Sequence, residues 1–388
     1  MKVQTVYAYV SRGVLTPVRR DPELGSLFAL EDVRAVGERG RSSRRGRAAS
    51  DDVRTQITEV TAGELSYRGY AVSQLVRTRS VEEVRRLLVG GRGDEPGRST
   101  SRGLDPQREW PGADERAALA AVIDALPPGS STLDRFKHAV LVAGATDVGR
   151  QDRSAAAFAR AGERAVRFMT LALSPGGVPA ERSKGNDGSL AAALADAVGG
   201  CPVEVVEAVL VLLADHDLAV STTAVRVAVS SGADPYGALL AGLAAADSPH
   251  HMAAPSRALD WLEAALRDPR AAIDTALAGG KPVGFGHVVY TEQDPRAQVL
   301  LELLEPFADA EALVALRLVE RELVDRRGWV LTVDTSLALL MQTFGLPRDA
   351  GTALFACART AGWTAHAIEE LAEPGMRFRL KGVYTAPR

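Results

Sequence analysis

One stretch decides the fold of this chain: Gly284-Phe285-Gly286-His287-Val288-Val289-Tyr290, which Asp294-Pro295-Arg296 follows. Glycine lets the backbone approach a ligand closely, and histidine can polarise or protonate a carbonyl near neutral pH. Arginine can bind a carboxylate through two parallel hydrogen bonds. The stretch therefore predicts a site for a small anionic keto acid around His287 and Arg296.

Most of the chain around this stretch has the spacing of helices rather than strands. A short strand-like opening lies near residues 65–70, residues 91–115 are rich in Gly, Pro, Arg and Asp and predict an exposed loop, and no internal repeat is evident. Apolar residues at helical intervals predict a mostly α body. The expected helices are 117–126, 131–143, 153–173, 190–198, 202–215, 222–231, 235–246, 256–267, 295–305, 310–326, 335–344 and 348–371.

Composition excludes several classes of protein. The 388 residues are 46% hydrophobic and 24% charged, which is ordinary for a globular protein, and no apolar run is long enough to span a bilayer. Basic residues such as Arg12 interrupt the apolar stretches of the N-terminus, so it lacks a signal-peptide pattern. Cys201 and Cys357 are far apart and form no metal motif, which predicts free thiols and a cytoplasmic protein.

The charge is divided unevenly along the chain. Residues 1–50 carry ten basic and five acidic side chains, a net charge of +5, and the whole chain has −3, so the remainder carries −8. Residues 37–51, with arginines among Gly and Ser, predict a flexible basic linker, most simply a solvated one. A basic N-terminal piece on an acidic body suggests different partners for the two parts.

Four of the six histidines stand, at three places in the chain, where chemistry is plausible. His216 follows an apolar helix, His250 and His251 interrupt two helices, and His287 lies in the glycine-rich bend. Downstream, Asp334 begins a helix as a lone carboxylate. From the residues alone a histidine at a helix end is more often structural, so these patterns leave binding and structural roles open. His138 and His366 are expected on helix faces without a catalytic role.

The ordered motifs resemble the citrate synthase family, which includes the 2-methylcitrate synthases. Each motif alone is weak, but their order and spacing together over residues 52–388 are specific. The matching segments are Tyr67-Arg68-Gly69-Tyr70, Ala214-Asp215-His216-Asp217 with Ser221-Thr222, Pro249-His250-His251, Gly284-Phe285-Gly286-His287 with Asp294-Pro295-Arg296, Val333-Asp334, Ala358-Arg359-Thr360-Ala361-Gly362-Trp363, and Tyr384.

The resemblance implies a role for each site residue. Asp334 would remove a proton from the acetyl-CoA methyl group, and His251 would stabilise the enol oxygen. His287 would polarise the carbonyl of oxaloacetate. The carboxylates would be held by His216, Arg296, Arg359 and Arg379. Condensation of acetyl-CoA or propionyl-CoA with oxaloacetate, as in the tricarboxylic acid cycle, then needs no metal and no redox cofactor.

The chain departs from the family pattern at several of these positions. Met252 stands where a glycine usually follows the motif histidine, and Ala219 and Thr332 each stand where the family has asparagine. Methionine adds bulk and removes the backbone freedom of glycine, so Met252 is predicted to crowd the thioester and limit turnover. The alternative function is therefore a catalytically weakened relative that acts as a metabolite-binding, partner-subunit or DNA-binding regulatory protein.

The resemblance also implies domains and partners. A citrate synthase-like two-domain helical fold would have a large domain from 52–252 and 346–388 and a small one from 253–345. Apolar helices within 190–246 would form a homodimer, or a heterodimer with a paralogue. Residues 1–36 resemble part of a MerR- or excisionase-like winged helix, with helices at 3–12 and from 31 to 36 and a hairpin of 14–18 with 26–28. That segment is a candidate DNA contact, or only a packing element.

Overall fold

The structure is a computed structural model that describes residues 19–21, 25–27, 53–90, 110–174, 189–248, 251–378 and 384. The chain forms two compact units, residues 1–55 and 56–388. In the first unit, strand β1 (Arg19–Asp21) pairs antiparallel with β2 (Gly25–Leu27). The predicted hairpin pairs 14–18 with 26–28, whereas here the first strand is Arg19–Asp21, which was predicted to lie between the strands; residues 14–18 are outside the described residues. The helices predicted at 3–12 and 31–36 and the linker lie outside the described residues.

The second unit begins with a small antiparallel sheet, which confirms the predicted strand-like opening. Its strands are β3 (Thr58–Val60), β4 (Leu65–Tyr67) and β5 (Tyr70–Ala71), in that order. The described part of the unit is otherwise helical, so the mostly α prediction is confirmed. The helices are α3 (Val72–Thr78), α4 (Val81–Gly90), α5 (Ala113–Asp124), α6 (Thr132–Ala145), α7 (Ala155–Leu171), α8 (Leu190–Ala197), α9 (Val203–Leu212), α10 (Val220–Ser230), α11 (Pro235–Ala246), α12 (Ala254–Arg267), α13 (Pro269–Gly279), α14 (Pro295–Leu304), α15 (Ala310–Arg327), α16 (Val333–Phe344) and α17 (Ala350–Leu371).

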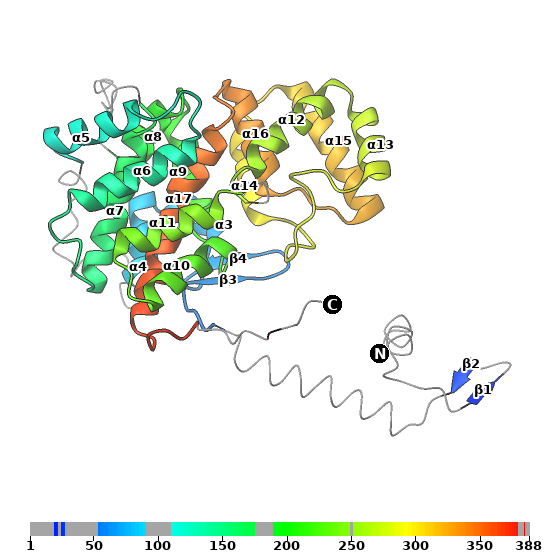
Figure 1. Cartoon of the computed structure of the whole chain (residues 1–388). Coiled ribbons are helices and arrows are strands. Elements are labelled where there is room, and N and C mark those ends of the chain that lie inside the picture. The colour runs from blue at the N-terminus through cyan, green and yellow to red at the C-terminus, as the bar shows by residue number, and fades with distance from the viewer. Residues whose placement is uncertain are drawn as a thin grey trace. The chain divides into compact units, whose positions relative to one another are not determined.

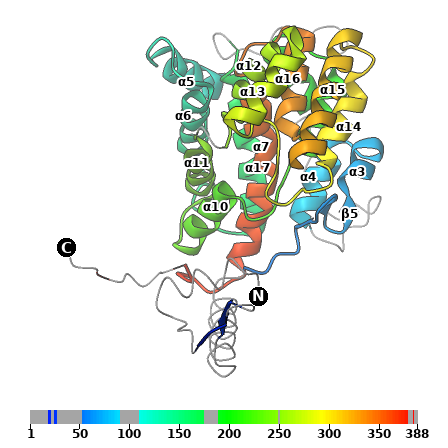
Figure 2. The ribbon, with the colours of Figure 1, turned by 90° about the vertical axis from the view of Figure 1, so that its right-hand side faces the viewer.

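Helix α17 forms the centre of the second unit. Every residue from Ala350 to Ala367 is buried, and a helix that is buried on all sides belongs to the core. It packs against α4, α7, α9, α10 and α11, and Figures 1 and 2 show it running between them. Residues on α17 can therefore reach several distant segments of the chain at once.

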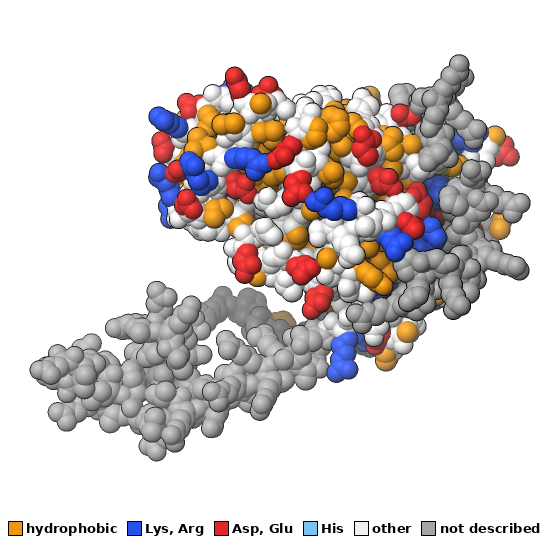
Figure 3. Space-filling view, turned by 180° about the vertical axis from the view of Figure 1, so that it is seen from behind, with side chains coloured by type: hydrophobic (Ala, Val, Ile, Leu, Met, Phe, Trp, Pro, Cys, Tyr) orange, Lys and Arg blue, Asp and Glu red, His pale blue; other side chains and the backbone are white. Residues whose placement is uncertain are grey.

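Helices α12 to α16 gather beside this central group (Figure 1). Helix α12 packs against α13, α15 and α16, and α14 packs against both α16 and α9. The division into a large domain (52–252 with 346–388) and a small domain (253–345) stays a prediction. Side chains of both charges and apolar ones are interspersed on the face drawn in Figure 3. Among the helices that the structure describes, none combines the length and apolarity needed to cross a membrane.

Candidate active site

The glycine-rich bend is held against the chain just before α16. The N–H of Gly286 donates to Val330 O at 2.6 Å, and the N–H of Thr332 donates to Gly284 O at 2.9 Å. Gly284 has a φ of +88°, and a Cβ added there would lie 2.1 Å from Oγ1 of Thr335. Only glycine fits such a backbone, so this position fixes the bend, and with it His287, relative to the start of α16.

The loop itself decides which nitrogen of His287 carries the proton. Nδ1 of His287 accepts the backbone N–H groups of Val289 at 3.0 Å and Tyr290 at 3.1 Å. A ring nitrogen that accepts cannot carry a proton, so in the neutral ring Nε2 is the donor. Burial and the nearby charge of Arg296 lower the pKa of His287. The residue therefore presents a neutral Nε2–H to a ligand.

Asp334 lies in the first turn of α16 and is poised as a base. Burial raises its pKa to about 6, against the opposing charge of Arg296 and with the help of the Asp294 carboxylate. The hydroxyl of Thr332 donates to Asp334 Oδ2 at 3.2 Å. A carboxylate with a raised pKa is a stronger proton acceptor that is still ionised near neutral pH.

Arg296 is paired inside the protein more fully than its motif suggests. Its Nε and Nη2 donate to the two carboxylate oxygens of Asp294 at 2.9 and 2.8 Å. Asp294 also accepts the N–H of Val333 at 3.1 Å, at the start of α16. The bidentate hydrogen bonding that was expected for a substrate carboxylate is thus made with Asp294. Nη1 of Arg296 is the nitrogen that could bind a ligand.

His216 joins the same group of side chains from the end of α9. Its Nε2 lies 3.1 Å from Oη of Tyr290, and its ring centroid is 5.3 Å from that of His287. Burial, together with the charges of Arg296 and Arg359, holds the pKa of His216 well below its ordinary value. A neutral imidazole at this place can hydrogen-bond a carboxylate or carbonyl.

His251 is oriented by residues distant in sequence. The N–H of the Trp363 indole donates to Ser221 Oγ at 3.3 Å, and Ser221 Oγ lies 2.9 Å from Nε2 of His251. Because burial and the charge of Arg359 lower the pKa of His251 to about 4, the ring is neutral. Trp363 already donates to Ser221 Oγ, and among the described residues His251 Nε2 is the acceptor that faces the Ser221 hydroxyl. We therefore infer that the hydroxyl donates to Nε2, which leaves the proton on Nδ1.

Arg359 brings a positive charge without an ion-pair partner among the described residues into this region, although the Asp215 carboxylate partly offsets it. It is 1% exposed, and its Nε donates to Leu213 O at 3.0 Å. Its guanidinium lies 4.9 Å from the centroid of Phe355, whose ring is 5.7 Å from that of His251. No carboxylate of the described residues lies within ion-pair distance of it. A buried unpaired cation is costly, which favours an anionic ligand here.

The structure thus connects all but one of the predicted site residues. His216, His287 and Arg296 lie around Tyr290, Asp294 pairs with Arg296 and raises the pKa of Asp334, and His251 joins this group through Phe355 and Arg359. Arg379 lies outside the described residues, as does His250. Arg377 forms ion pairs with Glu370 and Glu373. Sequence reasoning assigned no role to Tyr290 and Asp294, although both stand in the quoted motif.

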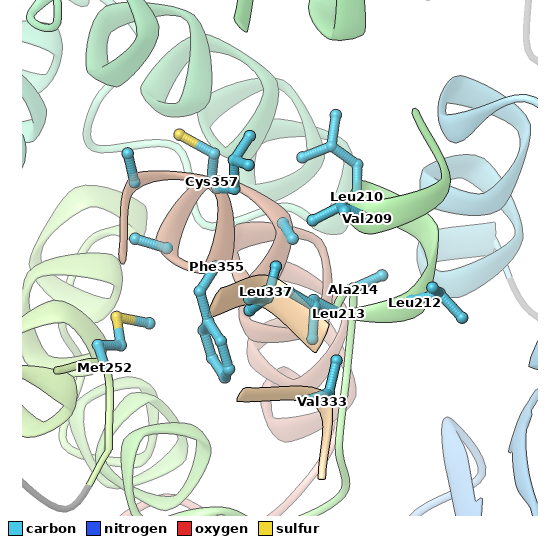
Figure 4. Close-up of a cluster of buried hydrophobic side chains, with 14 of the residues drawn as sticks. Val209, Leu210, Leu212, Leu213, Ala214, Met252, Val333, Leu337, Phe355 and Cys357 are labelled. Carbon is cyan, nitrogen blue, oxygen red and sulfur yellow. The ribbon is translucent and has the colours of Figure 1, made fainter. Parts of the chain in front are cut away.

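Met252 lies in the core in this structure, and its predicted effect on turnover stays a prediction. Met252 is 0% exposed and lies in the apolar cluster of Phe355, Leu337 and Val333 (Figure 4). Its φ is not among the positive values, so the backbone there does not need glycine. The side chain is part of the buried core cluster. Ala219 is the N-cap residue of α10 and provides no side-chain hydrogen bond there. The absence of asparagine at this position therefore affects the start of that helix.

The chain matches a sequence model described as "Citrate synthase, C-terminal domain" over residues 50–381. It belongs to the citrate synthase family. The match begins at residue 50 and so gives no support to the resemblance of residues 1–36 to a winged helix.

Named relatives agree with the family. The chain is 31% identical over 340 residues to 2-methylcitrate synthase 2 of Corynebacterium glutamicum, covering 79% of this chain and 85% of that one. It is 34% identical over 194 residues to putative citrate synthase 2 of Mycobacterium tuberculosis, covering 48% of this chain and 52% of that one. The chain thus spans about half the length of several curated relatives that it matches.

Solved structures share the fold. Citrate synthase from Pyrobaculum aerophilum has a TM-score of 0.73 and 25% identity, covering 88% of this chain and 92% of that one. Citrate synthase from Thermoplasma acidophilum, in a ternary complex with carboxymethyl coenzyme A and oxaloacetate, has the same TM-score at 24% identity, covering 88% and 96%. The citrate synthase-like fold is therefore confirmed.

Proposed function

We propose that this protein is an acyltransferase that condenses acetyl-CoA or propionyl-CoA with oxaloacetate and releases CoA. One observation carries the proposal: Asp334, a buried carboxylate of raised pKa, interacts with Arg296, which lies with His216 and His287 around Tyr290. The family, shared with relatives named citrate and 2-methylcitrate synthase, supports it.

Each residue then has one chemical task. Asp334 takes a proton from the carbon next to the thioester carbonyl, and the electron pair moves to the carbonyl oxygen. His251 donates its Nδ1–H to that oxygen and stabilises the enol. The enol carbon attacks the ketone carbon of oxaloacetate, whose oxygen accepts a hydrogen bond and then a proton from Nε2 of His287. Water hydrolyses the thioester product, and CoA leaves as the thiol.

The charged residues explain why the keto acid must be anionic. Arg359, Nη1 of Arg296 and the neutral His216 would bind the carboxylates, with Arg379 as a further predicted ligand. The Arg359 cation has no carboxylate partner among the described residues, so an oxaloacetate carboxylate would supply the missing charge. The chemistry uses only these side chains, and acyl-CoA serves as a substrate, so we propose that no resident cofactor or metal takes part.

A thiol-detection assay of CoA release tests the proposal. Acetyl-CoA and propionyl-CoA are supplied separately, each with and without oxaloacetate, and we expect release that depends on oxaloacetate. Asp334→Asn should lower the rate about 10²- to 10⁴-fold while calorimetry shows oxaloacetate bound as before. Binding of both substrates without release by the natural protein would instead favour the alternative of a weakened, regulatory or partner-subunit relative.

The cellular setting follows from the same proposal. We propose a cytoplasmic protein whose reaction belongs to the tricarboxylic acid cycle or to propionyl-CoA use, according to which acyl-CoA is preferred. We also propose a homodimer, or a heterodimer with a paralogue, through apolar helices within 190–246. Sedimentation that shows a stable monomer at micromolar concentration would contradict the dimer. The winged-helix resemblance of residues 1–36 and its DNA contact stay predictions.

A further inference from the structure

His216 stands in a sharp turn that one buried carboxylate organises. Asp217, the next residue, has a φ of +52°, a left-handed conformation that is strained for a side chain other than glycine, asparagine or aspartate. Its N–H donates to Asp215 Oδ2 at 3.1 Å, and the hydroxyl of Thr58 donates to the same oxygen at 2.6 Å. Asp215 is 0% exposed, so its carboxylate fixes this turn from within the core.

The peptide on either side of the turn is fixed as well. The N–H of Asp215 donates to Tyr67 Oη at 3.2 Å, and Tyr67 Oη lies 3.1 Å from Asp215 O. The N–H of Gly362 on α17 donates to Ala214 O at 2.9 Å. A Cβ at Gly362 would lie 2.0 Å from Asp215 Oδ1. Helix α17 therefore approaches the turn closely enough for its side chains to act on it.

His366 on α17 connects Asp215 to a buried arginine. Nη1 of Arg226 lies 2.9 Å from His366 Nδ1, and arginine can only donate. His366 Nδ1 is thus the acceptor, and Nε2 carries the proton that points to Asp215 Oδ2 at 3.3 Å. Arg226 is held in turn by Glu369 at 2.7 Å and Glu370 at 2.9 Å. Because Arg226 can only donate, it sets the direction of both hydrogen bonds of His366: from Arg226 to His366, and from His366 to Asp215.

We propose that His366 is a positioning residue for His216. Among the described residues its hydrogen bonds join Arg226 and Asp215, and it acts by orienting Asp215, whose carboxylate sets the turn that places the His216 ring. The inference deepens the proposed function, on which its effect on oxaloacetate binding rests. The sequence predicts His366 to be a helix-face residue without a catalytic role, and the proposal gives this residue, which is 0% exposed, an indirect task.

Two variants separate positioning from stability. His366→Ala removes both hydrogen bonds, whereas His366→Gln keeps an N–H for Asp215 and an oxygen for Arg226. We expect His366→Ala to weaken oxaloacetate binding by about 10- to 100-fold, as for residues that orient a ligand-binding side chain, with KM raised more than kcat is lowered. His366→Gln should recover most of the affinity. Cys357→Ala, a buried change elsewhere on α17, should leave the affinity unchanged.

A second readout needs no substrate. The chain has six histidines, so their ring carbon–proton signals can be resolved by NMR and the His216 signal assigned through His216→Gln. We expect that signal to shift in His366→Ala and to return in His366→Gln. An unshifted signal in the folded His366→Ala variant, or equal effects of the Gln and Ala variants, would overturn the positioning role. If the natural protein binds no oxaloacetate, the proposed function fails, and the NMR result alone decides this inference.

Discussion

His251 and His287 are both neutral, yet opposite ring nitrogens carry their protons. His287 receives two backbone N–H groups from its own loop, within three residues of itself. His251 receives its hydrogen bond from Ser221, which is itself oriented by Trp363, 142 residues further along the chain. The tautomer of His287 is thus set by a local motif and that of His251 by tertiary packing. Different substitutions should therefore disturb the two tautomers.

The largest effect should come from the bend that holds His287. Gly284→Ala would place a side chain at a φ of +88° and 2.1 Å from Thr335 Oγ1. Because a displacement of about 1 Å can cost on the order of 100-fold in rate, we expect at least that loss of CoA release. Gly280→Ala is the matched control, because its φ is +108° but no atom lies within 4 Å of the added carbon. Equal losses in both would show that backbone strain alone matters.

The pH dependence of kcat/KM should report the ionisation of Asp334 and not that of His251 or His287. The pKa of His251 is about 4 and that of His287 is lowered, whereas that of Asp334 is raised to about 6. A base acts only when deprotonated, so kcat/KM should fall as the pH falls below about 6, by about tenfold per pH unit. The rate above pH 7 should be level. A change in kcat/KM with a midpoint above pH 7 would contradict the assignment of the pH dependence to Asp334.

A smaller loss of kcat is expected when Ser221, which orients His251, is changed. Ser221→Ala removes the hydrogen bond to Nε2, so the two tautomers of His251 compete, and kcat should fall about tenfold while oxaloacetate affinity stays close to that of the natural protein. Thr223→Ala is the control, because the Thr223 hydroxyl binds only Leu218 O, at 3.3 Å. Steady-state kinetics of both variants would make the comparison. An unchanged kcat in Ser221→Ala would remove Ser221 from the account.

The smallest effect on catalysis is expected beside His251, at Met252. Since its side chain fills the core, Met252→Gly should lower the free energy of unfolding by about 2–5 kcal/mol without raising CoA release per folded molecule. Met252→Leu, which nearly conserves volume, should cost less than about 1.5 kcal/mol. Denaturant unfolding and the thiol assay measure both. A faster Met252→Gly would support the view that methionine crowds the thioester.

The same division into local and distant causes explains what the sequence could predict. Helices with regular apolar spacing, such as α11 and α14, were predicted at nearly their observed bounds. Helix α13 was missed because Asp268-Pro269 marks the end of α12, although Asp268 also caps α13 and Pro269 begins it. The short helices α3 and α4 were missed as well.

The site follows the same rule. His287, Asp334 and Arg296 lie in motifs whose local structure holds them, and the sequence predicted a role for each, which stays a prediction. The hydrogen bond between Ser221 and His251 and the burial of Met252 depend on how separate elements pack. Spacing along the chain carries no signal for such contacts.

The central claim is that the two neutral histidines hold their protons on opposite nitrogens. Ring ¹⁵N NMR of histidine-labelled protein at pH 7 tests it directly, with His251→Gln and His287→Gln to assign the signals. We predict a protonated Nε2 in His287 and a protonated Nδ1 in His251. The same tautomer in both rings, or a charged imidazolium in either, would contradict the account.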